Sequence, residues 1–333
     1  MQVPIFEKYP MLWHYTTATG LDGILRSQQL WATDFRYLND DEELRGFFIR
    51  KFPSILRKGI DEGINKIANS PRYQHMIEVA GDEDKIKSKF YQTLYDKIKE
   101  VTLELNVYVT SFCFSSESVS NDGLLSQWRG YGHDGGYAIV FDTKGLSNLL
   151  DKEQEQFTYP FWDLSDVDYH DDELKNNTIR HPETIKWERK IIEIVSKIVV
   201  DVEEGNFEKI AAELAEPTIM LAIRHKHQGF KEECEVRIVI VLFPNNIIEA
   251  AGMLEIYPLS IKTVLFRQFA GVLVPYISLF DNIPENDRKL PIKRIIVGPH
   301  PDKWKRQKSV QMMLDKLEIE ATVSVSDIPF LGR

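Results

Sequence analysis

The run EVRIVIVL at residues 235–242 constrains the fold of this chain more than any other stretch. Every residue after Arg237 in the run is apolar, which predicts a strand buried on both of its faces. Glu235 and Arg237 are two residues apart, so on a strand their side chains share one face. A buried carboxylate is costly unless it is paired or used in chemistry. The run therefore predicts either a structural Glu–Arg ion pair or a catalytic carboxylate whose position the sheet fixes.

A second informative stretch runs from Val107 to Asp142. Aromatic and β-branched residues at Val107 to Phe114 and at Tyr137 to Phe141 predict two strands. The residues between them carry more hydrogen-bonding and aromatic side chains than a simple connection needs, and loops held by rigid strands are where sites usually lie. An ordinary hairpin with aromatic packing is the alternative. The side chains concerned are Ser111, Ser115, Gln127, Trp128, Arg129, Tyr131 and His133.

Strand patterns at both ends of the chain, with helical patterns between them, predict an α+β fold. We expect a single domain, 1–333, with helical insertions at about 42–105 and 183–228. Apolar residues at helical spacing predict the strongest helices at 83–105 and 183–204. Pro217 should kink or split a further helix at 207–227. Further strands are predicted at 12–15, 30–33, 235–242, 263–267, 272–279, 292–297 and 319–326, and further helices at 21–27, 42–52, 54–69 and 302–317.

Composition excludes several classes of protein. The formal net charge of −10 argues against a general nucleic-acid coat, which would carry excess Lys and Arg. Two cysteines, Cys113 and Cys234, cannot form a disulfide framework or a four-cysteine zinc site. The N-terminal residues lack the pattern of a signal peptide, and no stretch approaches the roughly 20 apolar residues of a membrane span. We therefore expect a soluble cytoplasmic protein.

Two further groups of residues have open interpretations. His14 lies between aromatic residues on a predicted strand, where it would either hydrogen-bond a ligand or pair with the backbone at the edge of the core. The acidic segment containing Asp166, Asp168 and His170 could hold a metal ion, but it lacks the fixed spacing of a calcium loop. A solvated acidic turn without metal is the better prediction for that segment.

Several short motifs together resemble a bacterial family known as domain of unknown function 2971. The matching pieces occur in the expected order: Trp13-His14-Tyr15-Thr16, Leu21-x-x-Ile24-Leu25, Leu30-Trp31, Asn39-Asp40-x-x-Glu43, Ser111-Phe112-Cys113-Phe114-Ser115, Gln127-Trp128-x-x-Tyr131, Gly136-Tyr137-x-Ile139-x-Phe141-Asp142, Phe230-Lys231, Glu235-x-Arg237 and Ile295-x-Val297-Gly298-Pro299. Arg129, Gly130 and Cys113 depart from the usual pattern.

The same arrangement more distantly resembles the ADP-ribosyltransferase superfamily. That resemblance implies a split β-sheet around an NAD cleft, with His14, Ser111 and Glu235 as the three-part signature. It implies Glu235 and Arg237 as catalytic residues and no metal. NAD, as substrate, would contact the residues His14, Tyr15, Thr16, Ser111, Phe112, Trp128, Arg129 and Tyr131.

The expected function is therefore cleavage of the nicotinamide–ribose bond of NAD and transfer of ADP-ribose to a macromolecular acceptor, either protein or nucleic acid. The resemblance further implies an intracellular toxin or phage-defence effector. One alternative is a non-catalytic sensing or interaction module on the same fold, because fold does not imply function. A metal-dependent nuclease using Asp166, Asp168 and His170 is the third hypothesis.

Overall fold

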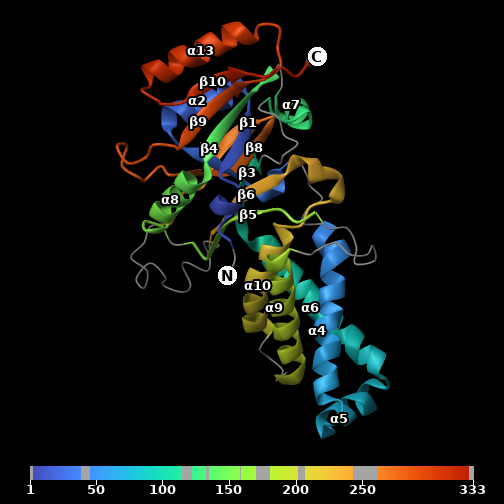
Figure 1. The fold of residues 1–333 in the computed structure, drawn as a ribbon. Helices are drawn as coiled ribbons and strands as arrows, with labels where there is room; N and C mark the ends of the chain where they lie inside the picture. Colours follow the sequence, from blue (N-terminus) through green and yellow to red (C-terminus); the bar gives the residue numbers. More distant parts are fainter. Residues whose placement is uncertain are drawn as a thin grey trace. The chain divides into compact units, whose positions relative to one another are not determined.

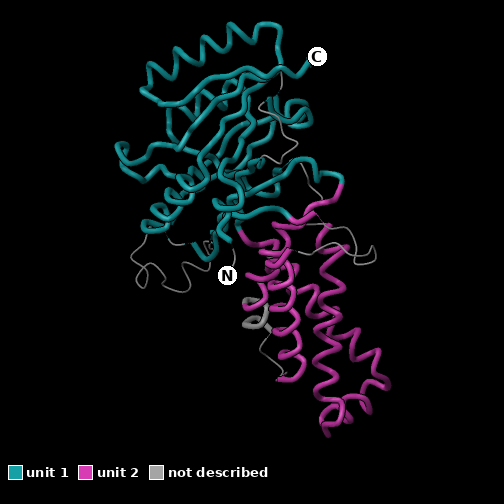
Figure 2. Tube along the Cα trace, in the orientation of Figure 1, with its two compact units in different colours: residues 1–38, 106–167, 229–333 teal, residues 39–105, 168–228 magenta. Residues whose placement is uncertain are grey.

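The computed structural model describes residues 3–38, 46–114, 122–132, 135–157, 159–169, 181–201, 207–242 and 261–329 (Figure 1). The chain divides into two compact units, which are coloured separately in Figure 2. Unit 1 comprises Met1–Leu38, Asn106–Val167 and Gly229–Arg333, and unit 2 comprises Asn39–Leu105 and Asp168–Gln228.

Unit 1 is built on an open mixed sheet of ten strands. The main path of strands runs in the order β10-β9-β4-β1-β3-β2-β8-β7, and β6 and β5 lie off this path. Among the pairs of described strands, only β9 and β10 run parallel. The strands are β1 (Met11–Thr16), β2 (Leu30–Asp34), β3 (Asn106–Phe114), β4 (Tyr137–Asp142), β5 (Phe161–Asp166), β6 (Glu235–Leu242), β7 (Leu265–Phe269), β8 (Val272–Leu279), β9 (Ile292–Val297) and β10 (Thr322–Val325).

The sheet branches at β3. One edge of β3 pairs with β6 along almost its whole length, and the two strands lie side by side in Figure 1. The other edge pairs with β1 at Cys113 and Phe114 but with β2 at Tyr108 and Val109. Since β1 and β2 share this edge, they diverge on either side of Ser111. The result is a split in the sheet between β1 and β2.

The two faces of the sheet differ in what covers them. On one face, which we call the helix-covered face, the main core includes Leu12, Phe112 and Val236. Leucines of α2 (Ala18–Ser27) and α8 (Thr143–Gln154) join this core, as do Val310 and Leu314 of α13 (Lys303–Lys316). The opposite face, which we call the aromatic face, carries a smaller core of Trp13, Tyr15, Cys113, Trp128, Ala138, Val140 and Ile296.

Unit 2 is helical in its described part. A glycine allows the close approach of its two most extensively packed helices, α4 and α9, because a Cβ at Gly63 would lie 2.6 Å from the Cβ of Val199. An ion pair of 3.1 Å joins Lys51, just before α4, to Glu188 of α9. The elements are a π-helical turn (Phe47–Lys51), α4 (Phe52–Ile67), α5 (Pro71–Ala80), α6 (Glu83–Glu104), α9 (Pro182–Asp201) and α10 (Phe207–Ala222).

The structure confirms most predicted elements, including the long helices α6 and α9 and the strand β6. Pro217 was expected to kink or split its helix, and the structure excludes the split, because α10 runs through Pro217 as one helix. Packing of α10 against α9 and α6 compensates for the lost backbone hydrogen bond. Helix α8 was not predicted, although Asp142 is a regular N-cap that accepts a 2.8 Å hydrogen bond from Gly145 N.

The two predicted helical insertions fall within the segments of unit 2. The single-domain assignment itself stays a prediction. The Asn39-Asp40-x-x-Glu43 motif, Ser115 and His133 lie outside the described residues. Among the helices that the structure describes, none is long and apolar enough to cross a bilayer.

Candidate functional site

Glu235 and Arg237 form a bidentate ion pair at the start of β6. Arg237 Nε donates to Glu235 Oε1 over 2.7 Å and Arg237 Nη2 donates to Oε2 over 3.0 Å. Both residues are buried, with 4% and 3% of their surface exposed. The fork of the guanidinium matches the two carboxylate oxygens and fixes the plane of the carboxylate. The prediction that these side chains share a face is therefore confirmed.

Ser111 and Cys113 of β3 lie directly opposite this pair. The register pairs Cys113 with Glu235 and Ser111 with Arg237, so all four side chains share one face. Cys113 belongs to the core of the aromatic face, which assigns Glu235, Arg237 and Ser111 to that face as well. Because Ser111 marks the split between β1 and β2 on the other edge of β3, the ion pair lies across β3 from the split.

His14 occupies the split from β1. Its Nδ1 lies 3.0 Å from the carbonyl oxygen of Ser111, so Nδ1 carries the proton and donates. Burial lowers the pKa of His14 below its ordinary value, which favours the neutral imidazole. Where β1 leaves β3, the imidazole thus gives the Ser111 carbonyl the hydrogen bond that a backbone N–H would otherwise donate. In this tautomer Nε2 is the acceptor nitrogen.

His14 and Glu235 point to opposite faces of the sheet. The neighbours of His14 on β1, Trp13 and Tyr15, lie on the aromatic face, so the His14 side chain lies on the helix-covered face. Its ring is 5.7 Å from that of Phe112, which belongs to the helix-covered core. Of the predicted triad, Ser111 and Glu235 share the aromatic face. His14 contacts only the backbone carbonyl of Ser111, and its ring lies on the opposite face from the Glu235 carboxylate.

Tyr15 and Trp128 form an aromatic contact on the aromatic face. Their ring centroids are 4.8 Å apart in an edge-on arrangement. Trp128, on α7 (Leu125–Tyr131), donates from Nε1 to the Asp122 carbonyl over 3.0 Å. The Tyr15 hydroxyl accepts a 2.8 Å hydrogen bond from Leu124 N, and burial raises the pKa of Tyr15 above its ordinary value. These bonds anchor α7 to the sheet.

The remaining predicted binding residues fall into two groups. Ser111 is half-buried on the aromatic face, whereas Arg129 and Tyr131 are exposed on α7. Phe112 is buried on the helix-covered face, and Thr16 lies on that same face opposite Tyr137. The structure thus brings Tyr15, Ser111, Trp128, Glu235 and Arg237 to one face of the sheet and places His14, Thr16 and Phe112 on the other.

A glycine contact closes the loop after α7. A Cβ at Gly298 would lie 1.6 Å from the Gly135 carbonyl oxygen, so only glycine fits there. Gly298 N donates to the Gly136 carbonyl over 3.0 Å. The motif Val297-Gly298-Pro299 at the end of β9 therefore holds the glycine-rich loop that precedes β4.

The acidic residues of the nuclease hypothesis are engaged in other contacts. Asp166 pairs with Lys8 and accepts a 3.0 Å hydrogen bond from Tyr9, whose pKa burial raises to about 12. Asp168 accepts a 2.5 Å hydrogen bond from Thr184. His170 lies outside the described residues, and within those residues no cluster of His, Cys, Asp or Glu could hold a metal ion.

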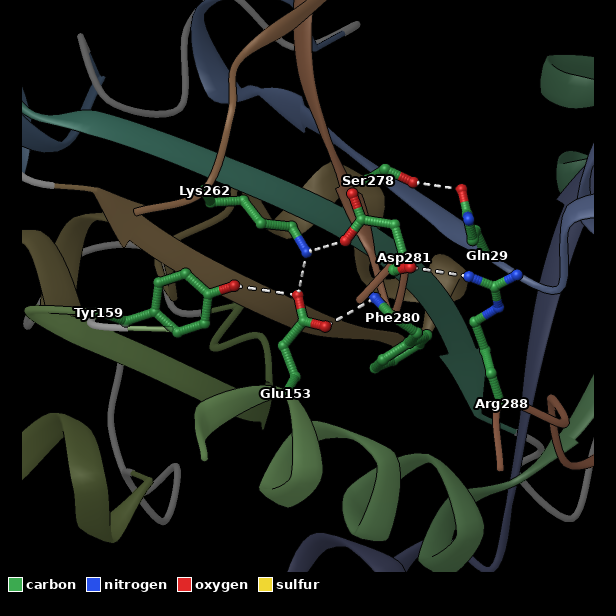
Figure 3. A network of polar contacts seen from close by, with 8 residues as sticks. All are labelled: Gln29, Glu153, Tyr159, Lys262, Ser278, Phe280, Asp281 and Arg288. Atoms are coloured by element: carbon green, nitrogen blue, oxygen red, sulfur yellow. Dashed lines mark hydrogen bonds and ion pairs between the residues drawn. The ribbon is translucent and has the colours of Figure 1, made fainter. Parts of the chain in front are cut away.

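A buried network around Glu153 was missed by the sequence analysis (Figure 3). Lys262 Nζ lies 2.5 Å from Glu153 Oε1 and 2.5 Å from Asp281 Oδ1. Only 1% of the Glu153 and Lys262 side chains is exposed. The partners come from separate segments 109 residues apart, so no local pattern joins them. The one hint in the sequence is that Glu153 falls on the same helical face as the buried residues Leu146, Leu149 and Leu150 of α8.

The Glu153 carboxylate also holds two other groups. Tyr159 donates its hydroxyl to Oε1 over 2.9 Å, and Phe280 N donates to Oε2 over 2.7 Å. Phe280 has φ 71°, a left-handed conformation that is strained for an aromatic residue. Glu153 therefore stabilises an unfavourable backbone turn after β8.

Unit 1 thus has an open mixed α/β sheet, with the buried Glu235–Arg237 ion pair across β3 from the split. Residues 127–238 match the model of a family described as "Protein of unknown function (DUF2971)". This range contains the Trp128 segment and the Glu235-x-Arg237 motif, so it supports the resemblance to that family. No curated protein matches the chain, and no solved structure matches it.

Proposed function

We propose that this chain is an ADP-ribosyltransferase-like enzyme that cleaves the nicotinamide–ribose bond of NAD. The observation that supports the proposal most is the placement of Glu235. It opens β6 across β3 from the split of the sheet, on a face that also carries Ser111 and Tyr15. NAD is suggested by the resemblance of the ordered motifs to the ADP-ribosyltransferase superfamily.

The chemistry requires a fixed negative charge. Cleavage of an N-glycosidic bond passes through an oxocarbenium-like state, whose positive charge a nearby carboxylate stabilises. Arg237 donates to both Glu235 oxygens and fixes the plane of the carboxylate, which in the proposed reaction would accept a ribose hydroxyl. Arg237 would thus orient the carboxylate, and Tyr15, Trp128 and Ser111 would line the NAD site.

Under this proposal His14 acts differently from the three-part signature. Its hydrogen bond to the Ser111 carbonyl would position β3 beside β1, and the Ser111 side chain would reach the ligand. The acceptor of ADP-ribose would be a protein or a nucleic acid. Growth arrest on expression of the wild type, absent with Glu235→Gln, is the cellular outcome expected of a toxin or defence effector.

The deciding experiment combines calorimetric titration of NAD with a nicotinamide-release assay. The wild type should bind NAD and release nicotinamide, and Glu235→Gln should lower the release rate at least about 100-fold. Glu232→Gln is the matched control, because it removes the same charge from an exposed position three residues earlier. Circular dichroism of both variants separates loss of activity from loss of fold.

A non-catalytic binding module is a second candidate, favoured by one observation. Both carboxylate oxygens of Glu235 already accept hydrogen bonds from Arg237, as they would in a purely structural pair. This candidate predicts that Glu235→Gln leaves the cellular phenotype intact and that a ligand or partner binds the loop at residues 128–136. No NAD binding by the wild type at millimolar concentration would contradict the enzyme proposal and favour the binding module.

A further inference from the structure

The β7–β8 hairpin exposes more apolar surface than a solvated hairpin should. Phe266, Phe269, Val272 and Leu273 are exposed by 63%, 63%, 50% and 66%. Within the part of the chain that the structure describes, β7 ends the sheet and pairs on one side only, with β8. Soluble proteins usually protect such an edge with charged residues, because a free edge pairs with other strands.

The sequence of β8 shows which residues of β7 point outward. Phe266 lies opposite Pro275, which has no N–H to donate, so this pair is not a hydrogen-bonded one. Antiparallel pairs alternate, so the pairs at Arg267 and Phe269 carry the bonds to β8. The backbone N–H and C=O groups of Phe266 and Gln268 therefore point away from β8, toward the free edge.

Arg267 is the charged residue of the hairpin, and no Asp or Glu occurs from Leu265 to Leu279. Its Nη2 donates to Thr33 Oγ1 over 3.1 Å, and its guanidinium lies 5.6 Å from the centre of the Trp31 ring. Nε is buried without a hydrogen-bond partner, and burial lowers the pKa of Arg267. The head group thus points inward over β8, and no Asp or Glu in the described part of the chain forms an ion pair with it.

We propose that two copies of this chain form a symmetric dimer by antiparallel pairing of β7 with β7, with the two-fold axis at Gln268. This inference is independent of the proposed function. The N–H and C=O of Gln268 then bond to those of the partner's Gln268, which gives a hydrogen-bonded pair on the axis. The sheets of the two copies become continuous, and the exposed edge disappears.

Side-chain chemistry selects this axis. Arg267 lies opposite the partner's Phe269 in the non-bonded pairs, where the Cα atoms are only about 4.5 Å apart. The Phe269 ring covers the aliphatic stem of Arg267, and no like charges face each other. An axis at Arg267 would oppose two arginines. An axis at Phe266 would bring the partner's hairpin tip, residues 270 and 271, against residues 262 and 261, and the Lys262 side chain is only 1% exposed.

Two variants that introduce opposite charges at Phe269 test the pairing by sedimentation velocity. The wild type should sediment as a dimer of twice 38.7 kDa. Phe269→Lys places like charges opposite Arg267 twice and should weaken the dimer about tenfold or more. Phe269→Glu removes the same ring but places a carboxylate opposite each Arg267, so the charges attract and the dimer should persist. A wild-type monomer up to about 100 μM, or equal loss of the dimer in both variants, would overturn the proposal.

Cysteine cross-linking tests the axis independently. Two copies of Gln268→Cys would meet with Cα atoms about 5.5 Å apart, which suits a disulfide. In Phe266→Cys the Cα atoms of the two introduced cysteines would be roughly 14 Å apart, which is too far for a disulfide. Mild oxidation should therefore cross-link Gln268→Cys alone, with the wild type as the baseline for Cys113 and Cys234. Efficient cross-linking of Phe266→Cys would show a different pairing.

Discussion

Two buried carboxylates in unit 1 are held in contrasting ways. Glu235 is held by Arg237, two residues along the same strand, through a planar bidentate pair. Glu153 is held by Tyr159, six residues further on, and by Lys262 and Phe280, which are 109 and 127 residues away in sequence. The first arrangement fixes one side chain in orientation, whereas the second joins several segments of the chain. Glu153 therefore has the character of a structural junction, whereas Glu235 is the site residue of the proposed function.

The largest expected loss of stability comes from substitution of Lys262, which tests the structural role of Glu153. The Lys262→Met substitution leaves Glu153 buried without its cation, which costs about 3–5 kcal/mol of unfolding free energy. Urea denaturation measures the loss. Lys289→Met is the matched control, since Lys289 is exposed on the nearby segment, and it should change stability by less than about 0.5 kcal/mol. Similar values for the two variants would contradict the structural role of the Glu153 network.

A smaller effect is expected at Arg237. Arg237→Lys keeps the positive charge but loses the two-pronged contact with Glu235, so it should cost about 1–2 kcal/mol. Nicotinamide release should fall as well, if the fork orients the carboxylate for catalysis. Unchanged stability and activity would show that the charge alone is sufficient.

The next effect concerns Tyr159. Tyr159→Phe removes one donor from Glu153 and should cost about 1 kcal/mol at pH 7. Burial of the Tyr159 hydroxyl raises its pKa above the ordinary value of 10.0. The stability that this group contributes is fully present below pH 10 and is lost as the pH rises above that value. Denaturation at pH 8 and pH 11 should thus show a smaller loss in Tyr159→Phe than in the wild type.

The smallest effect is the pH dependence of His14. Burial lowers the pKa of His14 in the folded state below the ordinary value of 6.5, so its contribution is full above pH 6.5 and is lost as the pH falls. The loss reaches at most about 0.8 kcal/mol at pH 6. His14→Asn retains a donor for the Ser111 carbonyl without titrating, so its unfolding free energy should fall less between pH 7.5 and pH 6. If the unfolding free energies of the variant and the wild type changed equally with pH, the lowered pKa of His14 would be contradicted.

What the sequence predicted and what it missed follow from the range of the interactions. The shared face of Glu235 and Arg237 follows from the two-residue period of a strand, and the long helix α6 follows from its apolar spacing. The Glu153–Lys262 contact joins residues that only the complete fold brings together. The opposite orientation of His14 depends on strand register, which a three-residue signature spread over the chain does not encode.

The pairing of β3 with β6 has a consequence for how the chain acquires its structure during synthesis. Residues 106–113 find their partners in residues 235–242, so this ladder cannot form until the later segment has left the ribosome. Until then β3 is an apolar strand with an open edge, a target for chaperones and for aggregation. Helix α4 packs against α9, and α6 packs against α10, so the helices of unit 2 can complete their contacts once residues 182–222 have been made, which is before β6. The sheet that carries the candidate site should therefore be the last part of the protein to become folded.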